Sequence, residues 1–146
     1  MKLETPQRGS VIRYAYLWAD EHRRGRDEAT KERPSLVLAL TIHRTDGRAQ
    51  VLVLAITHAK PSNPSDAVPL PPNIKNQLGL DSEASWIVTT EANAFLWPGP
   101  DLRPVPDREP ATVFYGQIPD KLLQEVALSY LENRKKQLGE IVSRST

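Results

Sequence analysis

Three side chains suited to phosphate chemistry stand at the ends of two aliphatic segments. Arg33 comes just before the apolar run 35–42, whereas Thr57 and His58 end the run 50–57. A short polar turn joins the two runs, which together are typical of a β-hairpin. The start of the first strand in a hairpin lies beside the end of the second. We therefore expect a guanidinium, an alcohol and an imidazole close together, and this combination suits the binding and cleavage of a phosphodiester.

Arg33 and Thr57 have distinct roles in such chemistry. RNA can be cut without a metal when its own 2′-hydroxyl attacks the neighbouring phosphorus, which leaves a cyclic phosphate and a 5′-hydroxyl. A guanidinium makes two parallel, charge-assisted hydrogen bonds to phosphate, so Arg33 is the candidate for stabilising the developing negative charge. Thr57 does not accept a proton near neutral pH, and its hydroxyl would instead hold the phosphate in line with the attacking oxygen.

Two further residues are candidates for proton transfer. Imidazole titrates near neutral pH, which favours His58, but alternation along a strand directs it to the face opposite Thr57 unless the strand ends there. Glu91, at the end of a later strand, could accept the 2′-hydroxyl proton or orient Arg33 through an ion pair. Ordinary structural roles are also open: solvated charges for Arg33, His58 and Glu91, and strand propensity for Thr57.

Length and composition indicate one domain without a bound metal or cofactor. The 146 residues suffice for a single core, and 19 Lys and Arg against 18 Asp and Glu give a formal charge of +1. Any attraction to a polyanion must therefore be local. The chain has no cysteine and three histidines without HExxH spacing, which argues against a disulfide framework and a zinc site.

Neither a secretory signal nor a membrane span is expected. The N-terminal segment 1–9 is polar, and every apolar run is far shorter than the roughly 20 residues that cross a bilayer. These features, together with the absence of cysteine, predict a cytoplasmic protein without membrane contact.

The apolar pattern predicts an α+β domain, mainly β with helices. A short helix over 73–78 should end at Gly79, and apolar spacing predicts a longer amphipathic helix over 120–136. Short strands with one terminal helix suggest a small, strongly curved β-barrel. The expected strands are 10–18, 35–42 and 50–57 joined at Asp46-Gly47, 85–91 with a possible extension over 95–97, and short edge strands at 102–105 and 113–115.

One segment, 20–33, is expected to be a mobile, solvated loop within this domain. It holds five basic and five acidic residues and no large apolar side chain, so it cannot bury itself. Lys31, Arg24, Arg26 and, outside the loop, His58 are the candidate contacts to an RNA backbone. The neighbouring acids nearly cancel the basic charge of the loop, so ordinary solvation is the alternative.

Short motifs follow one another in a recognisable order along nearly the whole chain. They are Gly9 with Val11-Ile12, Lys31 with Arg33-Pro34, Ile56-Thr57, Val68-Pro69-Leu70, Gly79-Leu80-Asp81, a strand ending in Glu91, and Tyr115-Gly116-Gln117-Ile118-Pro119 before the last helix. In order and spacing the chain resembles the MazF/PemK family, the toxin components of bacterial toxin–antitoxin pairs.

The resemblance implies an SH3-like barrel that forms a homodimer and cleaves single-stranded RNA without a metal. It implies catalytic roles for Arg33 and Thr57, and a contribution from Glu91 as in some members of the family. It also implies a cognate antitoxin, which would lay a disordered acidic segment into the groove of the dimer. A growth-inhibiting endoribonuclease is therefore the leading prediction.

Two other functions are compatible with the same features. A catalytically inactive barrel of the MazF/PemK type would bind nucleic acid or a protein partner without turnover. A related toxin branch shares the barrel and poisons DNA gyrase by protein contact, but that branch does not depend on the arginine and threonine pair.

Overall fold

Two long strands, β2 (Arg33–Ile42) and β3 (Ala49–Thr57), form the centre of the fold in this computed structural model, which describes residues 3–25, 32–43, 45–136 and 140–144. β2 pairs with β1 and β3, and β3 pairs with β2 on one edge and with β5 and β6 on the other. Alternate side chains face two separate apolar cores. Burial on both faces explains the near-continuous aliphatic runs, and the expected central hairpin is confirmed.

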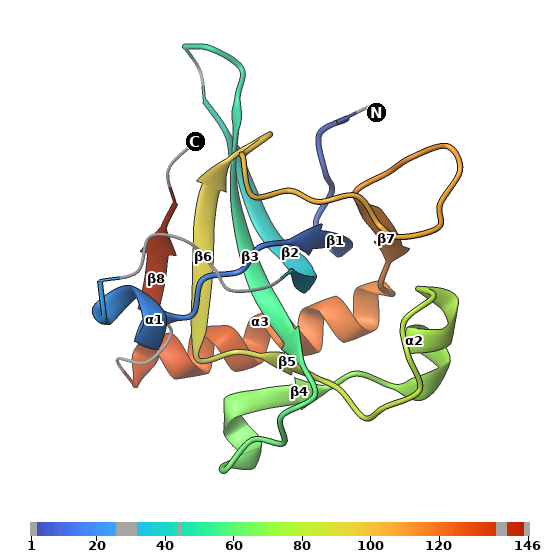
Figure 1. Cartoon of the computed structure of the whole chain (residues 1–146). Helices are drawn as coiled ribbons and strands as arrows, with labels where there is room; N and C mark the ends of the chain where they lie inside the picture. The colour runs from blue at the N-terminus through green and yellow to red at the C-terminus, as the bar shows by residue number, and fades with distance from the viewer. Residues whose placement is uncertain (1–2, 26–31, 44, 137–139, 145–146) are drawn as a thin grey trace.

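Within the described residues, eight strands form one mainly antiparallel sheet, which confirms the α+β class. The order is β4-β5-β3-β2-β1-β7, while β6 pairs with β3 and with β8, the latter in parallel. The path ends at β4 and β7 without closing, so the SH3-like barrel is not confirmed. The outer strands are β1 (Ser10–Tyr14), β4 (Ala67–Pro69), β5 (Trp86–Val88), β6 (Glu91–Leu96), β7 (Phe114–Gln117) and β8 (Glu140–Ser143) (Figure 1).

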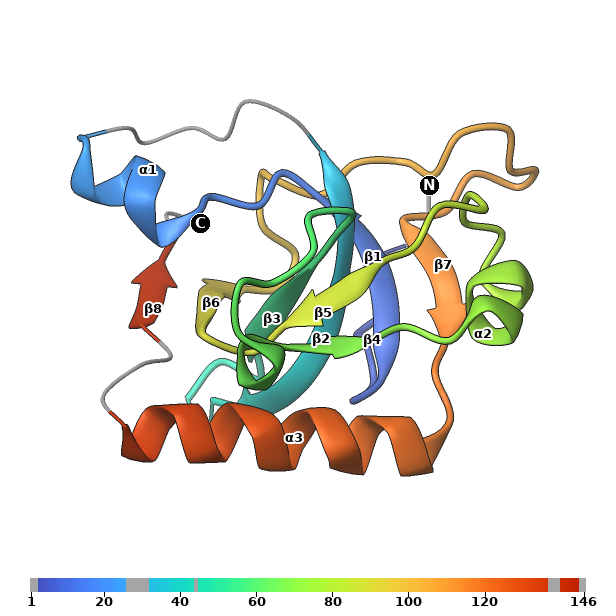
Figure 2. The ribbon, with the colours of Figure 1, turned by 90° about the horizontal axis from the view of Figure 1, so that it is seen from below.

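The helix α3 (Asp120–Lys135) runs along one face of the sheet (Figure 2). Its apolar stripe, with Leu122, Val126 and Tyr130, packs into the same core as alternate residues of β2 and β3. The spacing of these side chains is the amphipathic pattern that predicted the helix. No helix in the described part of the chain is long and apolar enough to span a bilayer.

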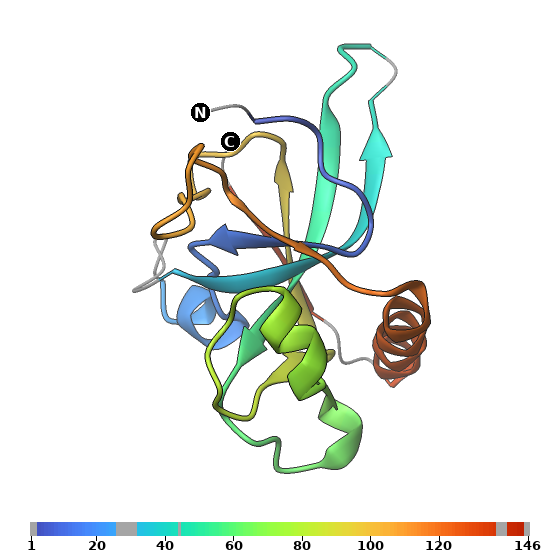
Figure 3. The same cartoon turned by 90° about the vertical axis from the view of Figure 1, so that its right-hand side faces the viewer.

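An aromatic core covers the opposite face of the sheet. Tyr14 stacks on Phe95 with ring centroids 4.7 Å apart, and Trp97 lies 5.7 Å from the ring of Phe114. Trp97 is buried, as a core residue would be. The end of β2 and the start of β3 project away from the rest of the molecule (Figure 3). The cores therefore fix the base of the hairpin, where Arg33 and Thr57 lie.

The first part of the predicted charged loop 20–33 instead forms the helix α1 (Ala19–Arg23). Two carboxylates supply acceptors at its start: Glu91 accepts from the backbone N–H of Ala19, and Glu21 accepts from the N–H that precedes it. Carboxylates at a helix N-terminus satisfy otherwise unpaired donors, and this support comes partly from a distant strand. Residues 26–31 of the predicted loop lie outside the described residues.

The strand expected over 85–91 is two strands, β5 and β6, that meet β3 at different places. β5 pairs with the end of β3 at Ile56 and Thr57, whereas β6 pairs with its first half. Between them Thr89 is fully buried, and both its N–H and its hydroxyl donate to the carbonyl oxygen of Asp66. These hydrogen bonds draw the chain away from β3, which a local reading of strand propensity does not reveal.

Candidate functional site

One row of cross-strand neighbours contains the side chains predicted to bind phosphate. The β2–β3 pairing begins with Ser35 opposite Ala55, and Arg33 and Thr57 lie two residues beyond this pair on their strands, on the same face of the sheet. Thr57 in turn pairs with Trp86 of β5. Directly opposed residues in an antiparallel pair share a face, with Cβ atoms about 4.5–5.5 Å apart. The guanidinium, the alcohol and the indole therefore start from adjacent positions on one face of the sheet.

Arg33, Thr57 and His58 line the same cavity, whose volume is about 160 Å³. The strand β3 ends at Thr57, so His58 lies beyond the alternation that would direct it to the opposite face. The hydroxyl of Thr57 accepts a hydrogen bond from the N–H of Ala59 at 3.1 Å, which marks a tight turn at this point. The turn brings the imidazole to the same cavity as the alcohol.

Arg33 is half-buried and has unused hydrogen-bonding capacity. Its Cζ lies 4.9 Å from the ring centroid of Trp18, in a cation–π contact. Its Nε is buried and has no hydrogen-bond partner among the described residues. Burial lowers the pKa of the Arg33 guanidinium from its ordinary value, and Glu21 opposes this shift. An unsatisfied buried donor costs about 1–3 kcal/mol, so this position of Arg33 costs stability.

The loop that follows the helix α2 (Pro72–Gln77) is set by the way this helix ends. Gly79 has φ +72° and donates to the carbonyl of Asn76 at 3.1 Å, while Leu80 donates to the carbonyl of Lys75 at 3.0 Å. This pair of bonds is the Schellman motif, and it confirms the predicted stop at Gly79. The motif sends the chain back past the side chain of Lys75.

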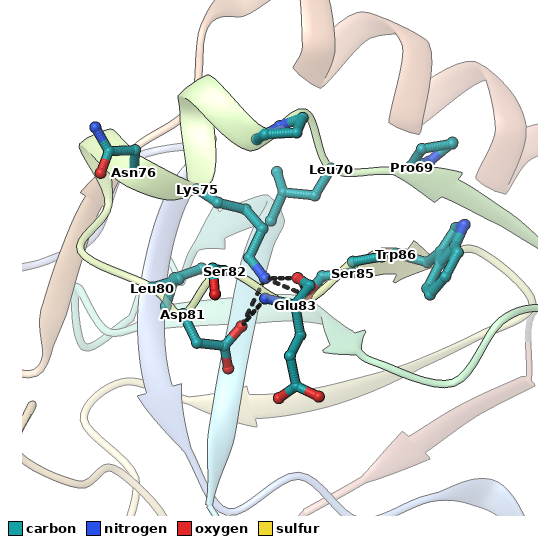
Figure 4. A pocket seen from close by; sticks show the side chains of 12 residues that line it. Pro69, Leu70, Lys75, Asn76, Leu80, Asp81, Ser82, Glu83, Ser85 and Trp86 are labelled. Carbon is teal, nitrogen blue, oxygen red and sulfur yellow. Dashed lines mark hydrogen bonds and ion pairs between the residues drawn. The ribbon is translucent and has the colours of Figure 1, made fainter.

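Lys75 is a buried lysine that holds this loop (Figure 4). Its ammonium donates to Asp81 Oδ1 at 2.8 Å, to Ser85 Oγ at 2.7 Å and to the carbonyl of Glu83. An ammonium has three protons, and these three acceptors use all of them. Lys75 therefore fixes the loop and its charge is matched by Asp81. Among the described residues that line this cavity, Arg33 is the other cation.

Asp81 contacts both Lys75 and His58, one of the two candidate proton acceptors. Its Oδ2 lies 2.9 Å from Nε2 of His58. The hydrogen bond from Lys75 holds the pKa of Asp81 below its ordinary value; desolvation opposes the shift and the contact with His58 adds to it. An ionised carboxylate only accepts hydrogen bonds, so Nε2 carries the proton. In neutral His58 the lone pair is then on Nδ1, which lies 3.8 Å from Oε2 of Glu83.

The same three side chains could also hold a cation. His58, Asp81 and Glu83 offer ligand atoms that all lie within 4.8 Å of one another, and all three residues are exposed. Imidazole with carboxylates is a common ligand set for transition metals. The ammonium of Lys75 already occupies one oxygen of Asp81, so a metal would have to compete with it.

Glu91 does not line this cavity. Its Oε2 accepts from the N–H of Ala19 at 2.7 Å and from the hydroxyl of Tyr16 at 3.3 Å. Glu91 begins β6, which pairs with the first half of β3, whereas Thr57 is the last residue of β3. The carboxylate thus supports α1 and does not join the arginine and the threonine.

The residues predicted to contact RNA do not all lie at this cavity. His58 lines the cavity, but Arg24 is an exposed residue that pairs with Asp20 at 3.1 Å. Arg26 and Lys31 lie outside the described residues.

Sequence reasoning missed four residues of the site: Lys75, Asp81, Ser85 and Trp86. Trp86 is on a short strand that pairs with β3, and Lys75 is on a helix and reaches the site through Asp81, which contacts His58. One local signal could have indicated the Lys75–Asp81 pair: Gly79, which ends α2, is followed two residues later by the acidic Asp81.

No known protein-family model matches the chain, and no curated protein is significantly similar to it in sequence. The functional inference therefore depends on the geometry of the site and on the residues that form it.

Proposed function

We propose that this protein is a metal-independent endoribonuclease of the MazF/PemK type that cleaves single-stranded RNA. One observation supports this most strongly: the half-buried guanidinium of Arg33 shares a cavity with Thr57 and with an imidazole that contacts Asp81. Two acids that line the cavity contact other cations, since Asp81 pairs with Lys75 and the carboxylate of Glu32 lies 3.6 Å from Arg103. Phosphate is the anion that suits this arrangement.

The proposed reaction is an internal transesterification. The 2′-oxygen forms a bond to phosphorus while the bond from phosphorus to the 5′-oxygen breaks, giving a cyclic phosphate and a 5′-hydroxyl. His58 Nδ1 takes the 2′-hydroxyl proton, and the departing 5′-oxygen takes a proton from solvent. Arg33 donates to the non-bridging oxygens, and the hydroxyl of Thr57 keeps the phosphate in line. Asp81 stabilises the imidazolium that forms.

The resemblance to the MazF/PemK family adds three parts to this proposal. They are a homodimer, a cognate antitoxin that competes with RNA for the site, and a location in the cytoplasm. A small acidic reading frame beside the gene and a dimer mass in solution are the corresponding observations.

A module that binds nucleic acid or protein without turnover is the second candidate. The position of Glu91 favours it, because a carboxylate expected to assist catalysis is engaged with Ala19 and Tyr16. Binding of RNA that yields no cut products would support this alternative.

The test is cleavage of single-stranded RNA by the full chain in the presence of EDTA. We expect products with cyclic phosphate and 5′-hydroxyl ends, and a loss of about 10²–10³ in rate for Arg33→Ala, as for removal of one preorganised donor. Arg48→Ala, an exposed arginine of the hairpin turn, is the matched control and should keep the wild-type rate. Equal rates for Arg33→Ala and wild type would remove Arg33 from the mechanism, and absence of cleavage would exclude the enzyme.

A further inference from the structure

A second and larger cavity, of about 380 Å³, adjoins the candidate site. Lys75, Leu80, Asp81 and Ser85 line both cavities, so the paired lysine and aspartate form the wall between them. The volume falls in the range of roughly 300–1,000 Å³ that is usual for sites of small ligands. A ligand whose anionic group is bound at Arg33 can therefore place a neighbouring group in the second cavity.

The lining of the second cavity suits a flat, mostly apolar group. Pro69, Leu70 and Pro72 line it together with the half-buried Trp86, and Figure 4 shows Pro69 and Trp86 at one end. The exposed amide of Asn76 stands at the other end. Apolar walls with a few polar groups at the rim are typical of pockets that receive rings bearing hydrogen-bonding edges.

Trp86 stands in the same row of the sheet as the phosphate-binding residues. It pairs with Thr57 on one side and with Pro69 on the other. Ile87, the next residue of β5, packs in the core under α3. Because neighbouring residues of a strand point to opposite faces of the sheet, Trp86 lies on the other face, which also carries Arg33 and Thr57. Arg33 on β2 and Trp86 on β5 are two strand steps apart, with Thr57 of β3 between them. Each step is about 4.7–4.9 Å, and this separation is compatible with a phosphate at the arginine and a ring at the indole.

We propose that the second cavity, which we call the indole pocket, binds a nucleobase next to the scissile phosphate, with Trp86 as its stacking surface. This inference rests on the proposed function and names the part of the RNA that the pocket recognises. A nucleotide combines an anion with a flat ring on one sugar, which matches a cation beside an aromatic pocket. An acidic peptide would need a carboxylate from one residue and a flat ring from another, whereas one nucleotide carries both groups, so the pair of cavities favours RNA over a protein segment.

The experiment measures binding, by fluorescence anisotropy, of labelled 2′-O-methyl RNA hexamers to the full chain. Four homopolymers, of A, C, G and U, are compared with an abasic hexamer that has the same phosphates and no bases. The variants are Trp86→Ala, Trp86→Phe and Ala84→Phe, which fills the pocket from an exposed lining position. Ala111→Phe, at an exposed position that lines neither cavity, is the matched control, and circular dichroism checks that each variant folds.

We expect at least one homopolymer to bind wild type about 5- to 150-fold more tightly than the abasic hexamer, which is the usual contribution of one stacked base. This preference should disappear in Trp86→Ala and Ala84→Phe, decrease in Trp86→Phe and remain in Ala111→Phe. Arg33→Ala should weaken the binding of base-containing and abasic hexamers by the same factor, because it removes a phosphate contact.

A wild-type protein without any base preference, or a preference that survives in both Trp86→Ala and Ala84→Phe, would overturn the inference and leave a peptide as the occupant to consider. The cleavage assay in EDTA tests the proposed function independently of the indole pocket. Cleavage without base preference would refute the indole pocket alone. A base preference that depends on Trp86, without cleavage, would refute the proposed reaction while the pocket stands.

Discussion

Two clusters of polar side chains in this molecule differ in how completely their hydrogen bonds are made. Beneath α3, the amide of Asn133 donates to the carbonyl oxygens of Ser65 and Thr89 at 3.0 and 3.1 Å, and the hydroxyls of Thr89 and Ser129 lie 2.8 Å apart. We call these four residues the anchor network. At the start of β2, in contrast, Arg33 keeps a buried Nε without a partner among the described residues.

The difference separates polar groups that stabilise the fold from those with capacity for a ligand. A satisfied buried network ties segments together and leaves no donor for a substrate. A buried donor left unsatisfied costs stability, and buried groups of this kind are often found at functional sites. Glu91 belongs to the first kind, since its carboxylate accepts from Ala19 and Tyr16, although its residue type suggested the second.

The largest expected effect comes from the imidazole at the cavity. His58→Gln should lower the rate of RNA cleavage by about 10²–10⁴, because a positioned acid or base usually contributes that factor. His43→Gln changes an exposed histidine of the hairpin turn in the same way and should leave the rate unchanged. Initial rates on a labelled single-stranded RNA measure both. A wild-type rate for His58→Gln would show that His58 takes no part in the reaction.

The anchor network should affect stability and not chemistry. Asn133→Leu removes the donor to the two carbonyl oxygens and should lower the free energy of unfolding by about 1–3 kcal/mol. Gln124→Leu, at an exposed position of the same helix, should stay within about 0.5 kcal/mol of wild type. Urea unfolding measures both changes. If the folded Asn133→Leu protein lost cleavage activity, the two clusters would not be separable.

Two buried tyrosines test whether every unpartnered group marks a ligand site. The hydroxyl of Tyr14 has no partner among the described residues, whereas that of Tyr16 donates to Glu91 at 3.3 Å. Tyr16→Phe should lower the free energy of unfolding by about 0.5–1.5 kcal/mol, and Tyr14→Phe should leave it unchanged or raise it. Thermal and urea unfolding are the measurements. Strong destabilisation by Tyr14→Phe would mean that its hydroxyl has an unrecognised role.

The smallest expected effect is the acid dependence due to Asp81. Because the pKa of this carboxyl is lower in the folded chain than in the unfolded chain, its ionised form stabilises the fold at neutral pH. That contribution is lost as the pH falls through the folded pKa. Asp81 is 51% exposed, so solvent screening limits the contribution to below about 1 kcal/mol.

Asp81→Asn keeps an oxygen acceptor for Lys75 and removes only the charge. The difference in unfolding free energy between wild type and Asp81→Asn should therefore be largest at neutral pH and shrink in acid. Urea midpoints at several pH values measure it. A difference that grows as the pH falls would contradict the direction of the pKa shift.

Much of the fold and part of the site could be predicted from local pattern. The aliphatic runs of β2 and β3, the glycine after α2 and the apolar stripe of α3 each depend on neighbouring residues. Bringing Arg33 near the end of β3 required only that the two aliphatic runs form a hairpin. The exact register could not be counted from the turn, because it shifts by one residue between Val37 and Ala39. The division between β5 and β6 could not be predicted in this way, because it depends on hydrogen bonds from Thr89 to Asp66, far away in the sequence.

The amino-acid sequence by itself determined the central hairpin and the residues at its base, since strand pairing across a short turn follows from nearby side chains. Only the tertiary structure decided what surrounds that base. Glu91 supports the start of α1. His58 reaches the cavity because β3 ends one residue before it. Lys75 and Asp81 line the same cavity, and Trp86 pairs with Thr57 beside it. The physical reason is that these residues are joined by long-range hydrogen bonds and register, which no local propensity encodes.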